Sequence, residues 1–147
     1  MKKKTIYCEC CNDECSYRVS LEKREVTIRG LTFSVEIKVA TCSKCHERVF
    51  PYEISRENDL IIYDKYKELK GLLTSKQIKE IREKRGMSQT ELARFINCGE
   101  KNIARYEKGA IQDNSFDLLI RLVGDDKAYK EMKKVKNNSN AKTALAI

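Results

Sequence analysis

The sequence predicts an α+β fold, in which a small antiparallel β domain precedes an all-α bundle of four to five helices. Two pairs of cysteines bracket a stretch where polar and apolar residues alternate, which is typical of strands with one buried face. From about residue 56 onward, apolar residues recur at helical spacing instead. A chain of 147 residues is long enough for two small domains of these kinds.

Composition limits the class of protein. Hydrophobic residues at 41% and charged residues at 35% indicate a soluble globular chain rather than a disordered one. No apolar run approaches the ~20 residues that span a bilayer. The basic start at residues 2–4 is not followed by the apolar core of a signal peptide. We therefore expect a cytoplasmic protein with reduced thiols and no membrane partner.

Positive charge is concentrated in the second half of the chain. The net charge is +8, of which residues 1–65 contribute +1 and residues 66–147 contribute +7. A cationic surface attracts the phosphate backbone of nucleic acids. The predicted helical half is therefore the candidate nucleic-acid-binding region.

Four cysteines have the spacing of a structural zinc site. Cys8 and Cys11 form one Cys-x2-Cys pair, and Cys42 and Cys45 form another after 30 intervening residues. Two such pairs supply the tetrahedral four-thiolate shell that structural zinc prefers. The sequence predicts one Zn²⁺ that stabilises the fold. Because four protein ligands leave no position for water, this ion should not be catalytic.

Other interpretations of these cysteines remain open at this stage. Cys10 and Cys15 compete as ligands in the first pair, although only Cys8 and Cys11 there have the x2 spacing. Residues 42–46 formally match the Cys-x-x-Cys-His haem attachment motif, but attachment normally requires export. A redox Cys-x-x-Cys usually opens a helix in a βαβ unit, and no such unit is predicted. His46 is expected to be a polar neighbour rather than a ligand.

Alternating residues between the cysteine pairs predict strands over 17–21, 25–29 and 32–40, with a turn at Gly30. The resulting sheet is too small to be stable through burial alone, so metal would supply the missing stability. We assign residues 1–54 to this zinc-binding β domain. Pro51 lies near the predicted boundary.

The rest of the chain is predicted to be helical. Residues 55–73 form a connecting helix whose apolar stripe is either intramolecular core or a dimer seam. Residues 74–124 form the bundle, beginning at the capping residues Thr74 and Ser75 and closing with a helix around Leu119. Residues 125–147 are rich in lysine and asparagine and are predicted to be a flexible basic tail.

Two short helices with a tight turn between them are predicted within residues 88–109. Leu92, Ala93 and Ile96 share one helical face. Asn97 and Gly99 tolerate the backbone angles of a turn. A second helix then runs from about residue 100 to 109. This pattern is a helix-turn-helix, in which the second helix enters the DNA major groove.

The motif Ser-Gln-x-Glu-Leu-Ala at 88–93, followed by Ile-Ala-Arg-Tyr-Glu-Lys-Gly at 103–109, resembles the Cro/repressor-type (xenobiotic-response-element) helix-turn-helix family. The resemblance covers roughly residues 74–123 and implies operator DNA as the partner. It implies backbone contacts from the start of the first helix and base contacts from the first turn of the second. The implied DNA-binding residues are Gln89, Glu100, Lys101, Asn102, Arg105 and Lys108.

The order of the two modules is similar to the MqsA (YgiT-type zinc finger) antitoxin family. This resemblance spans residues 8–123 and implies a homodimer that represses its own operon. It also implies that the zinc domain neutralises a protein toxin. Lys101 stands where the family has a recognition-helix asparagine, and the residues after Asp126 lie outside the family pattern.

Three other classes of function share parts of this sequence pattern. A stand-alone phage or mobile-element regulator would share both modules without a toxin. A single-strand or RNA-binding zinc protein is disfavoured because the zinc half is near neutral and lacks aromatic residues at stacking intervals. An enzyme is not expected, because one histidine and no carboxylate pair or phosphate loop leave no acid–base machinery.

Overall fold

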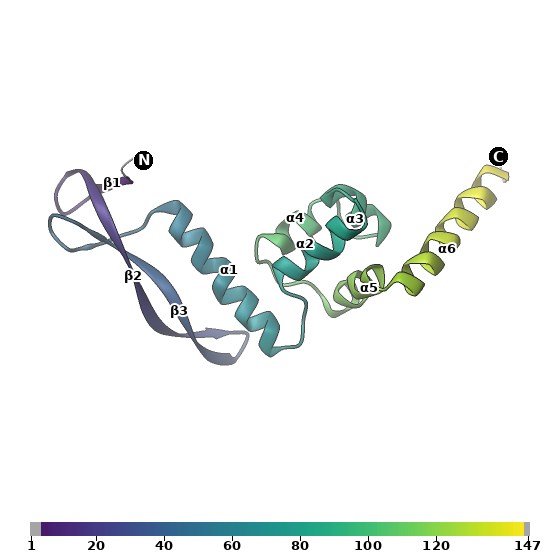
Figure 1. Ribbon diagram of the computed structural model, residues 1–147, viewed down its shortest axis with the longest axis horizontal. Coiled ribbons are helices and arrows are strands. Elements are labelled where there is room, and N and C mark those ends of the chain that lie inside the picture. The colour runs from purple at the N-terminus through teal and green to yellow at the C-terminus, as the bar shows by residue number, and fades with distance from the viewer. Residues whose placement is uncertain (1–3, 146–147) are drawn as a thin grey trace. The chain divides into compact units, whose positions relative to one another are not determined.

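The computed structural model describes residues 4–145, which fall into two compact units, Met1–Tyr66 and Lys67–Ile147 (Figure 1). The first unit contains a four-stranded antiparallel sheet and the second contains the helical bundle. The predicted α+β class, with strands first and helices after, is therefore confirmed.

The sheet of the first unit has its strands in chain order. They are β1 (Thr5–Cys8), β2 (Asp13–Ile28), β3 (Leu31–Cys42) and β4 (Arg48–Val49). The strands predicted over 17–21 and 25–29 fall on the single strand β2, which ends at Ile28, so Arg29 belongs to the turn and not to a strand. Its pairing with β3 continues without interruption from Tyr17↔Cys42 to Ile28↔Leu31. An unbroken ladder satisfies the backbone at residues 22–24, so no turn is needed there.

The turn between β2 and β3 occurs at Arg29 and Gly30, where the sequence predicts it. Both residues have positive φ, 47° and 81° respectively. A two-residue loop with two positive φ values matches the right-handed twist of the flanking strands. Glycine accepts this conformation at no steric cost, which explains its position in the loop.

Helix α1 (Tyr52–Leu69) follows Pro51 and covers an edge of β3. The side-chain amide of Asn58 donates to the carbonyl of Lys38 at 2.8 Å and accepts from the Lys38 N–H at 2.9 Å. Lys38 also forms an ion pair with Glu57. Asn58 therefore replaces a neighbouring strand at this point, where β4 is too short to pair with β3.

The second unit contains the rest of the helices. They are α2 (Ser75–Lys84), α3 (Gln89–Phe95), α4 (Asn102–Glu107), α5 (Asn114–Gly124) and α6 (Asp126–Leu145). The side chains of Thr74 and Ser88 each accept a hydrogen bond from the third backbone amide of the helix that follows. In return, the backbone amides of Thr74 and Ser88 donate to the side chains of Gln77 and Glu91. These reciprocal capping boxes fix where α2 and α3 begin.

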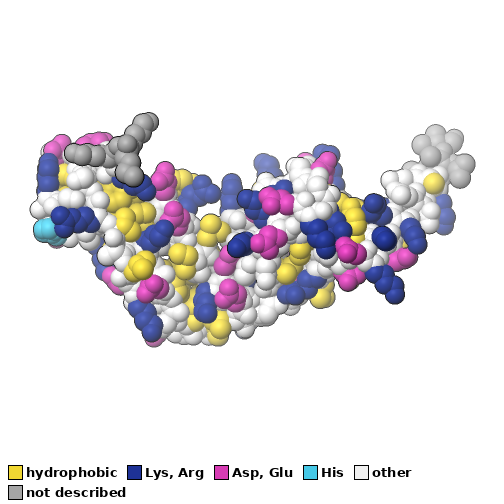
Figure 2. All heavy atoms as spheres, in the orientation of Figure 1, with side chains coloured by type: hydrophobic (Ala, Val, Ile, Leu, Met, Phe, Trp, Pro, Cys, Tyr) yellow, Lys and Arg dark blue, Asp and Glu magenta, His cyan; other side chains and the backbone are white. Residues whose placement is uncertain are grey.

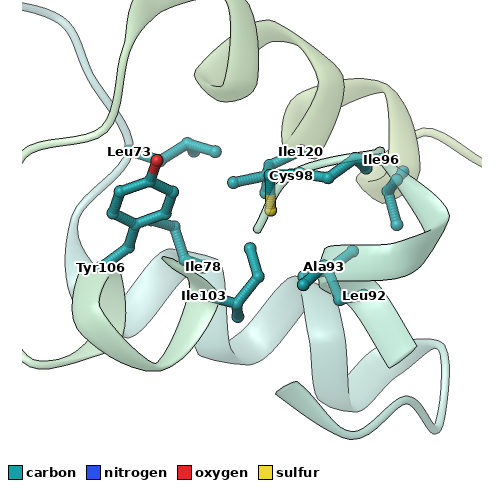
Figure 3. Close-up of a cluster of buried hydrophobic side chains, with 10 residues drawn as sticks. Leu73, Ile78, Leu92, Ala93, Ile96, Cys98, Ile103, Tyr106 and Ile120 are labelled. Atoms are coloured by element: carbon teal, nitrogen blue, oxygen red, sulfur yellow. The ribbon is translucent and has the colours of Figure 1, made fainter. Parts of the chain in front are cut away.

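Apolar side chains from α2 to α5 meet in one core (Figure 3). Ile78, Leu92, Ile103 and Ile120 come from four different helices and are completely buried. Cys98, in the turn after α3, is also buried in this core, and burial raises the pKa of its thiol. It is the small core residue that its position in the motif indicates.

Residues predicted as a flexible basic tail instead form α6 within the described part of the chain. The ring of Tyr129 packs against that of Phe95 of α3 in a tilted arrangement, with centres 5.5 Å apart, and Arg85 lies 4.3 Å from the centre of the Tyr129 ring. Met132 packs against the bundle core. The prediction of a flexible tail was wrong because it was based on the lysine and asparagine content. It did not use Tyr129 and Met132, which share one helical face.

Candidate metal centre and nucleic-acid interface

Four predicted ligand cysteines converge at one end of the sheet. Cys8 is the last residue of β1, and Cys11 lies in the turn that leads to β2. Cys42 is the last residue of β3, and Cys45 lies in the turn that leads to β4. Their four sulfur atoms lie within 4.8 Å of one another, so they can hold a metal ion.

The sulfur spacing fits tetrahedral coordination. Cys8 and Cys45 sulfurs are 3.6 Å apart, and Cys11 and Cys42 sulfurs are 3.9 Å apart. A tetrahedron of sulfurs about 2.3 Å from zinc has edges of about 3.8 Å. The two measured distances lie on either side of that value, and both join one cysteine pair to the other. The chain thus brings the quartet together at the size that a four-thiolate site requires.

Backbone amides in the second turn favour a thiolate. The Lys44 N–H points to the Cys42 sulfur at 3.4 Å. Hydrogen bonds from the Cys45 and Lys44 amides lower the pKa of Cys42 to about 6, whereas the bond with Cys45 is the main cause that raises the pKa of Cys11. One thiolate is therefore stabilised before a metal binds, and binding would release the proton of Cys11.

The other cysteines and His46 of this unit lie outside the quartet. Cys10 is exposed, and Cys15 is buried with its thiol directed to the Asp13 carbonyl at 3.6 Å. His46 is exposed, and its φ of 65° closes the turn with a 3.0 Å bond from its N–H to the Cys42 carbonyl. Within the described residues, the metal-ligand group contains the two x2 pairs only.

A second candidate site lies on α3, α4 and the turn between them. Asn97 has a φ of 58° in this turn, and the Cys98 N–H bonds the Ala93 carbonyl at 2.9 Å. Ile103 and Tyr106 anchor α4 in the core. The opposite side of α4 is therefore exposed, as the surface of a recognition helix must be.

One partly buried ion pair holds α2, α3 and α4 together. The Arg82 guanidinium donates to Glu107 at 2.6 and 3.2 Å and to the Met87 carbonyl at 2.9 Å. The hydrogen bond with Glu107 raises the pKa of Arg82. Gln89 donates its side-chain amide to the same carboxylate at 2.7 Å. This network fixes the angle between α3 and α4, and nothing in the spacing of the sequence indicated it.

The structure places the predicted DNA-contact residues in different environments. Lys101, Arg105 and Lys108 are exposed, and Lys101 immediately precedes α4. Asn102 begins α4 and is half-buried. Glu100 accepts from Arg94 at 2.7 and 2.9 Å, so its carboxylate is paired in the free protein.

Gln89 differs from a freely exposed phosphate-binding residue because Glu107 already takes one of its amide protons. An amide nitrogen carries two protons, and the second remains for a phosphate. The Glu107 bond orients the Gln89 amide before any ligand binds. The predicted role is compatible with this arrangement, which adds a positioning partner that the motif did not reveal.

Fold and site define a two-unit chain with a cysteine quartet in one unit and a helix-turn-helix in the other. Residues 78–123 match the model of the helix-turn-helix family. This match confirms the predicted motif and supports a DNA-binding transcriptional regulator whose partner is double-stranded DNA. No curated protein matches the chain. No helix in the described residues is long and apolar enough to cross a membrane.

Proposed function

We propose that the chain is a sequence-specific transcriptional repressor that places α4 in the major groove. The observation that carries this proposal is the combination of a core-anchored α4 with cationic residues on its free side. Lys101 and Arg105 are one turn apart, and both are exposed. Lysine and arginine donate to the acceptor edge of guanine, so both can read bases. Lys108 is placed at the far end of α4 for a backbone contact.

The Arg94–Glu100 ion pair must open before Glu100 can contact a base. Both side chains are well exposed, at 68% and 60%, so solvent screens the pair and it costs little to open. Glu100 can then accept from cytosine while Arg94 turns to a phosphate. Asn102, next to Lys101, can pair with adenine.

Binding of the full chain to the DNA upstream of its own gene tests this proposal. A mobility-shift titration at fixed salt should show tighter binding to that fragment than to a shuffled fragment of equal length. Arg105→Ala should reduce this preference. Lys79→Ala on α2 is a matched control, because it also removes one exposed positive charge and lies outside α3 and α4. Equal affinity of the wild-type chain for the two fragments would contradict a sequence-specific role.

We propose that the cysteine quartet binds one structural Zn²⁺. The support is a donor set of four thiols with two cross-pair distances near the tetrahedral value. Protein purified without chelator should contain one zinc per chain. Cys10→Ser is the control that leaves the quartet intact. A zinc content unaffected by Cys42→Ser would contradict the assignment.

We also propose that the first unit binds a protein toxin, so that the chain acts as an antitoxin. Phe50, Tyr52 and Tyr7 flank the cysteine quartet along the chain, and their side chains are 77%, 74% and 53% exposed. Exposed aromatic residues of this size are the usual anchors of protein interfaces. The antitoxin role rests on the resemblance in module order, to which these side chains add a candidate surface.

Co-expression with the product of the adjacent open reading frame tests the antitoxin role. The full chain should restore growth and co-purify with that product, and Phe50→Ser with Tyr52→Ser should weaken both effects. Leu21→Ser is a matched control, since Leu21 is 64% exposed on β2 in the same unit. If no neighbouring gene product is toxic, the antitoxin role is wrong and the chain is better explained as a stand-alone regulator. The proposal of DNA binding would still stand.

A homodimer would present two copies of α4 to two half-sites. Leu118 and Leu122 lie one helical turn apart on α5 and are 61% and 45% exposed. Such an apolar pair on an otherwise folded bundle supports association through the second unit. Sedimentation of wild-type protein and of Leu118→Lys should give a dimer and a monomer respectively.

A further inference from the structure

Helix α6 carries a row of lysines that the helix-turn-helix match, which ends at residue 123, does not include. Lys127, Lys130 and Lys133 are spaced three residues apart, and Lys134 follows directly; all four are exposed. At 3.6 residues per turn they lie on one side of the helix. We name these four residues the α6 basic face. Figure 2 shows Lys and Arg side chains along the part of the surface that α6 forms.

Acidic residues of α6 reduce this charge only at its edges. Asp126 is paired with Arg85 at 2.8 Å and with Lys84 at 3.2 Å, so it is already neutralised by α2. Glu131 is 3.0 Å from Lys134. Asp126 is thus neutralised from α2, and Glu131 offsets Lys134 of the basic face itself. The other three lysines, in the i, i+3, i+6 row, remain a local excess of positive charge.

The structure also holds α6 close to the candidate DNA-contact residues. Lys136 donates to the carbonyl of Arg94, in the last turn of α3, at 3.2 Å and lies 5.0 Å from the centre of the Phe95 ring. Arg94 in turn holds Glu100, the residue before Lys101. Tyr129 packs on Phe95, with Lys133 at 5.1 Å from the centre of its ring. The basic face is thus attached to the same helix that leads into the recognition turn.

We propose that the α6 basic face is a second phosphate-binding element, which contacts the DNA backbone beside the helix-turn-helix. This inference rests on the proposed DNA-binding function and extends it beyond α3 and α4. The partner is duplex DNA, because the row of lysines is attached to the helix that leads into the recognition turn, and each strand of a duplex presents a dense line of phosphate charges. Contacts of this kind add affinity and salt dependence without adding sequence preference.

Salt dependence of binding to a random-sequence duplex tests the inference without an operator. The full-length wild-type chain is compared with the triple variant Lys127→Gln, Lys130→Gln, Lys133→Gln. Each phosphate contact contributes about 0.9 to the slope of log affinity against log salt, so loss of one to three contacts should make the slope shallower by about 0.9–2.7. Affinity should fall by a similar factor for every sequence, so that preference for any one site is retained.

The double variant Lys76→Gln, Lys79→Gln is the matched control. These lysines are exposed on α2, and each lies about one turn from a glutamate, at 4.0 Å from Glu80 or Glu83. Their removal lowers the net charge without touching α6 and should change the slope by less than one contact. Glutamine keeps nearly the helix propensity of lysine, so both variants should retain the wild-type circular dichroism spectrum.

The outcomes separate the two proposals. If the wild-type chain binds the duplex and the triple variant keeps its slope, the α6 inference is wrong and the helix-turn-helix proposal stands. A different outcome is that the slope of log affinity against log salt becomes shallower by the same amount per lysine in the control variant as in the triple variant. In that case net charge explains the change in slope, and the inference is again wrong. If the wild-type chain ignores the duplex even in dilute salt, both proposals fail.

Discussion

Asp117 is the residue whose replacement tests the energetics of the helical unit most directly. Its carboxylate lies on α5 and is almost fully buried. It accepts from the Leu73 N–H at 2.8 Å, from the Gln112 amide at 3.0 Å and from the Arg121 guanidinium at 2.8 Å. Arg121 also donates to the Gly71 carbonyl at 2.7 Å. These bonds attach the segment before α2 to α5.

Two substitutions at Asp117 should differ in cost. Asp117→Ala leaves the buried Leu73 N–H without an acceptor, and it leaves one proton of the Gln112 amide unpaired while the other keeps its bond to the Leu73 carbonyl at 2.8 Å. At about 1–3 kcal/mol for each lost bond, with little from the 44%-exposed Arg121, the loss should be about 2–6 kcal/mol. Asp117→Asn keeps one carbonyl oxygen for Leu73 and Gln112 and loses only the bond with Arg121. Its cost should be about 0.5–1 kcal/mol.

Urea unfolding followed by far-ultraviolet circular dichroism measures both costs. The zinc-loaded full chain is used, so that the first unit contributes equally in every variant. Arg121→Gln is the comparison variant: it leaves the buried Asp117 carboxylate without its cation and also removes the bond to the Gly71 carbonyl, so it should cost more than Asp117→Asn. Equal stability of Asp117→Ala and Asp117→Asn would refute the reasoning, since it would mean that the Leu73 and Gln112 bonds contribute nothing.

The same carboxylate predicts how stability depends on pH. Burial alone would raise the pKa of Asp117, but hydrogen bonds from Arg121, Leu73 and Gln112 outweigh burial and lower it. A lowered pKa in the folded state stabilises the fold above the unfolded pKa of about 3.9, and this contribution disappears as pH falls through the folded value. Asp117→Asn should therefore flatten the loss of stability on acidification below about pH 4.

Three further predictions concern the site and its supports. Cys42→Ser should lower bound zinc from one per chain to well below one and destabilise the first unit, as measured by metal analysis and thermal unfolding, whereas Cys10→Ser should not. Arg105→Ala should cost about 1–3 kcal/mol of affinity for the preferred DNA fragment at matched salt; an unchanged binding isotherm would remove Arg105 from the interface. Ser88→Ala should cost about 1 kcal/mol of stability through loss of the α3 cap, and Ser88→Asp should restore most of it.

The sequence predicted best what depends on local spacing. A Cys-x2-Cys pair fixes two sulfurs within a single turn, so the quartet could be predicted without knowing the strands. The β2–β3 turn was found from Gly30, and the α2 and α3 starts from Thr74 and Ser88. In each case neighbouring residues determine the geometry, and the structure confirms it.

Features that depend on distant partners were not predictable. The Arg82–Glu107 pair joins residues 25 positions apart, and Asp117 reaches Leu73 across 44. Helix α6 looked like a tail because its lysines and asparagines dominate its composition. It is held by Tyr129 and Lys136, whose partners on α3 lie 34 and 42 positions away. Composition describes the solvent-facing side of such a helix and says little about the side that packs.

The two units achieve stability by different means, which bears on how their proposed functions are coupled. In the first unit the core cluster around the quartet consists of cysteines together with Ala40, Val49 and Ile54, whereas the buried Phe33, Val35 and Ile37 of β3 lie outside that cluster, so the quartet end buries little apolar area without a metal. The second unit has its own core, led by Ile78, Leu92, Ile103 and Ile120. Metal loss should therefore destabilise the quartet end of the first unit while α4 stays anchored. Regulation through the metal centre would then change partner binding before it changes DNA binding.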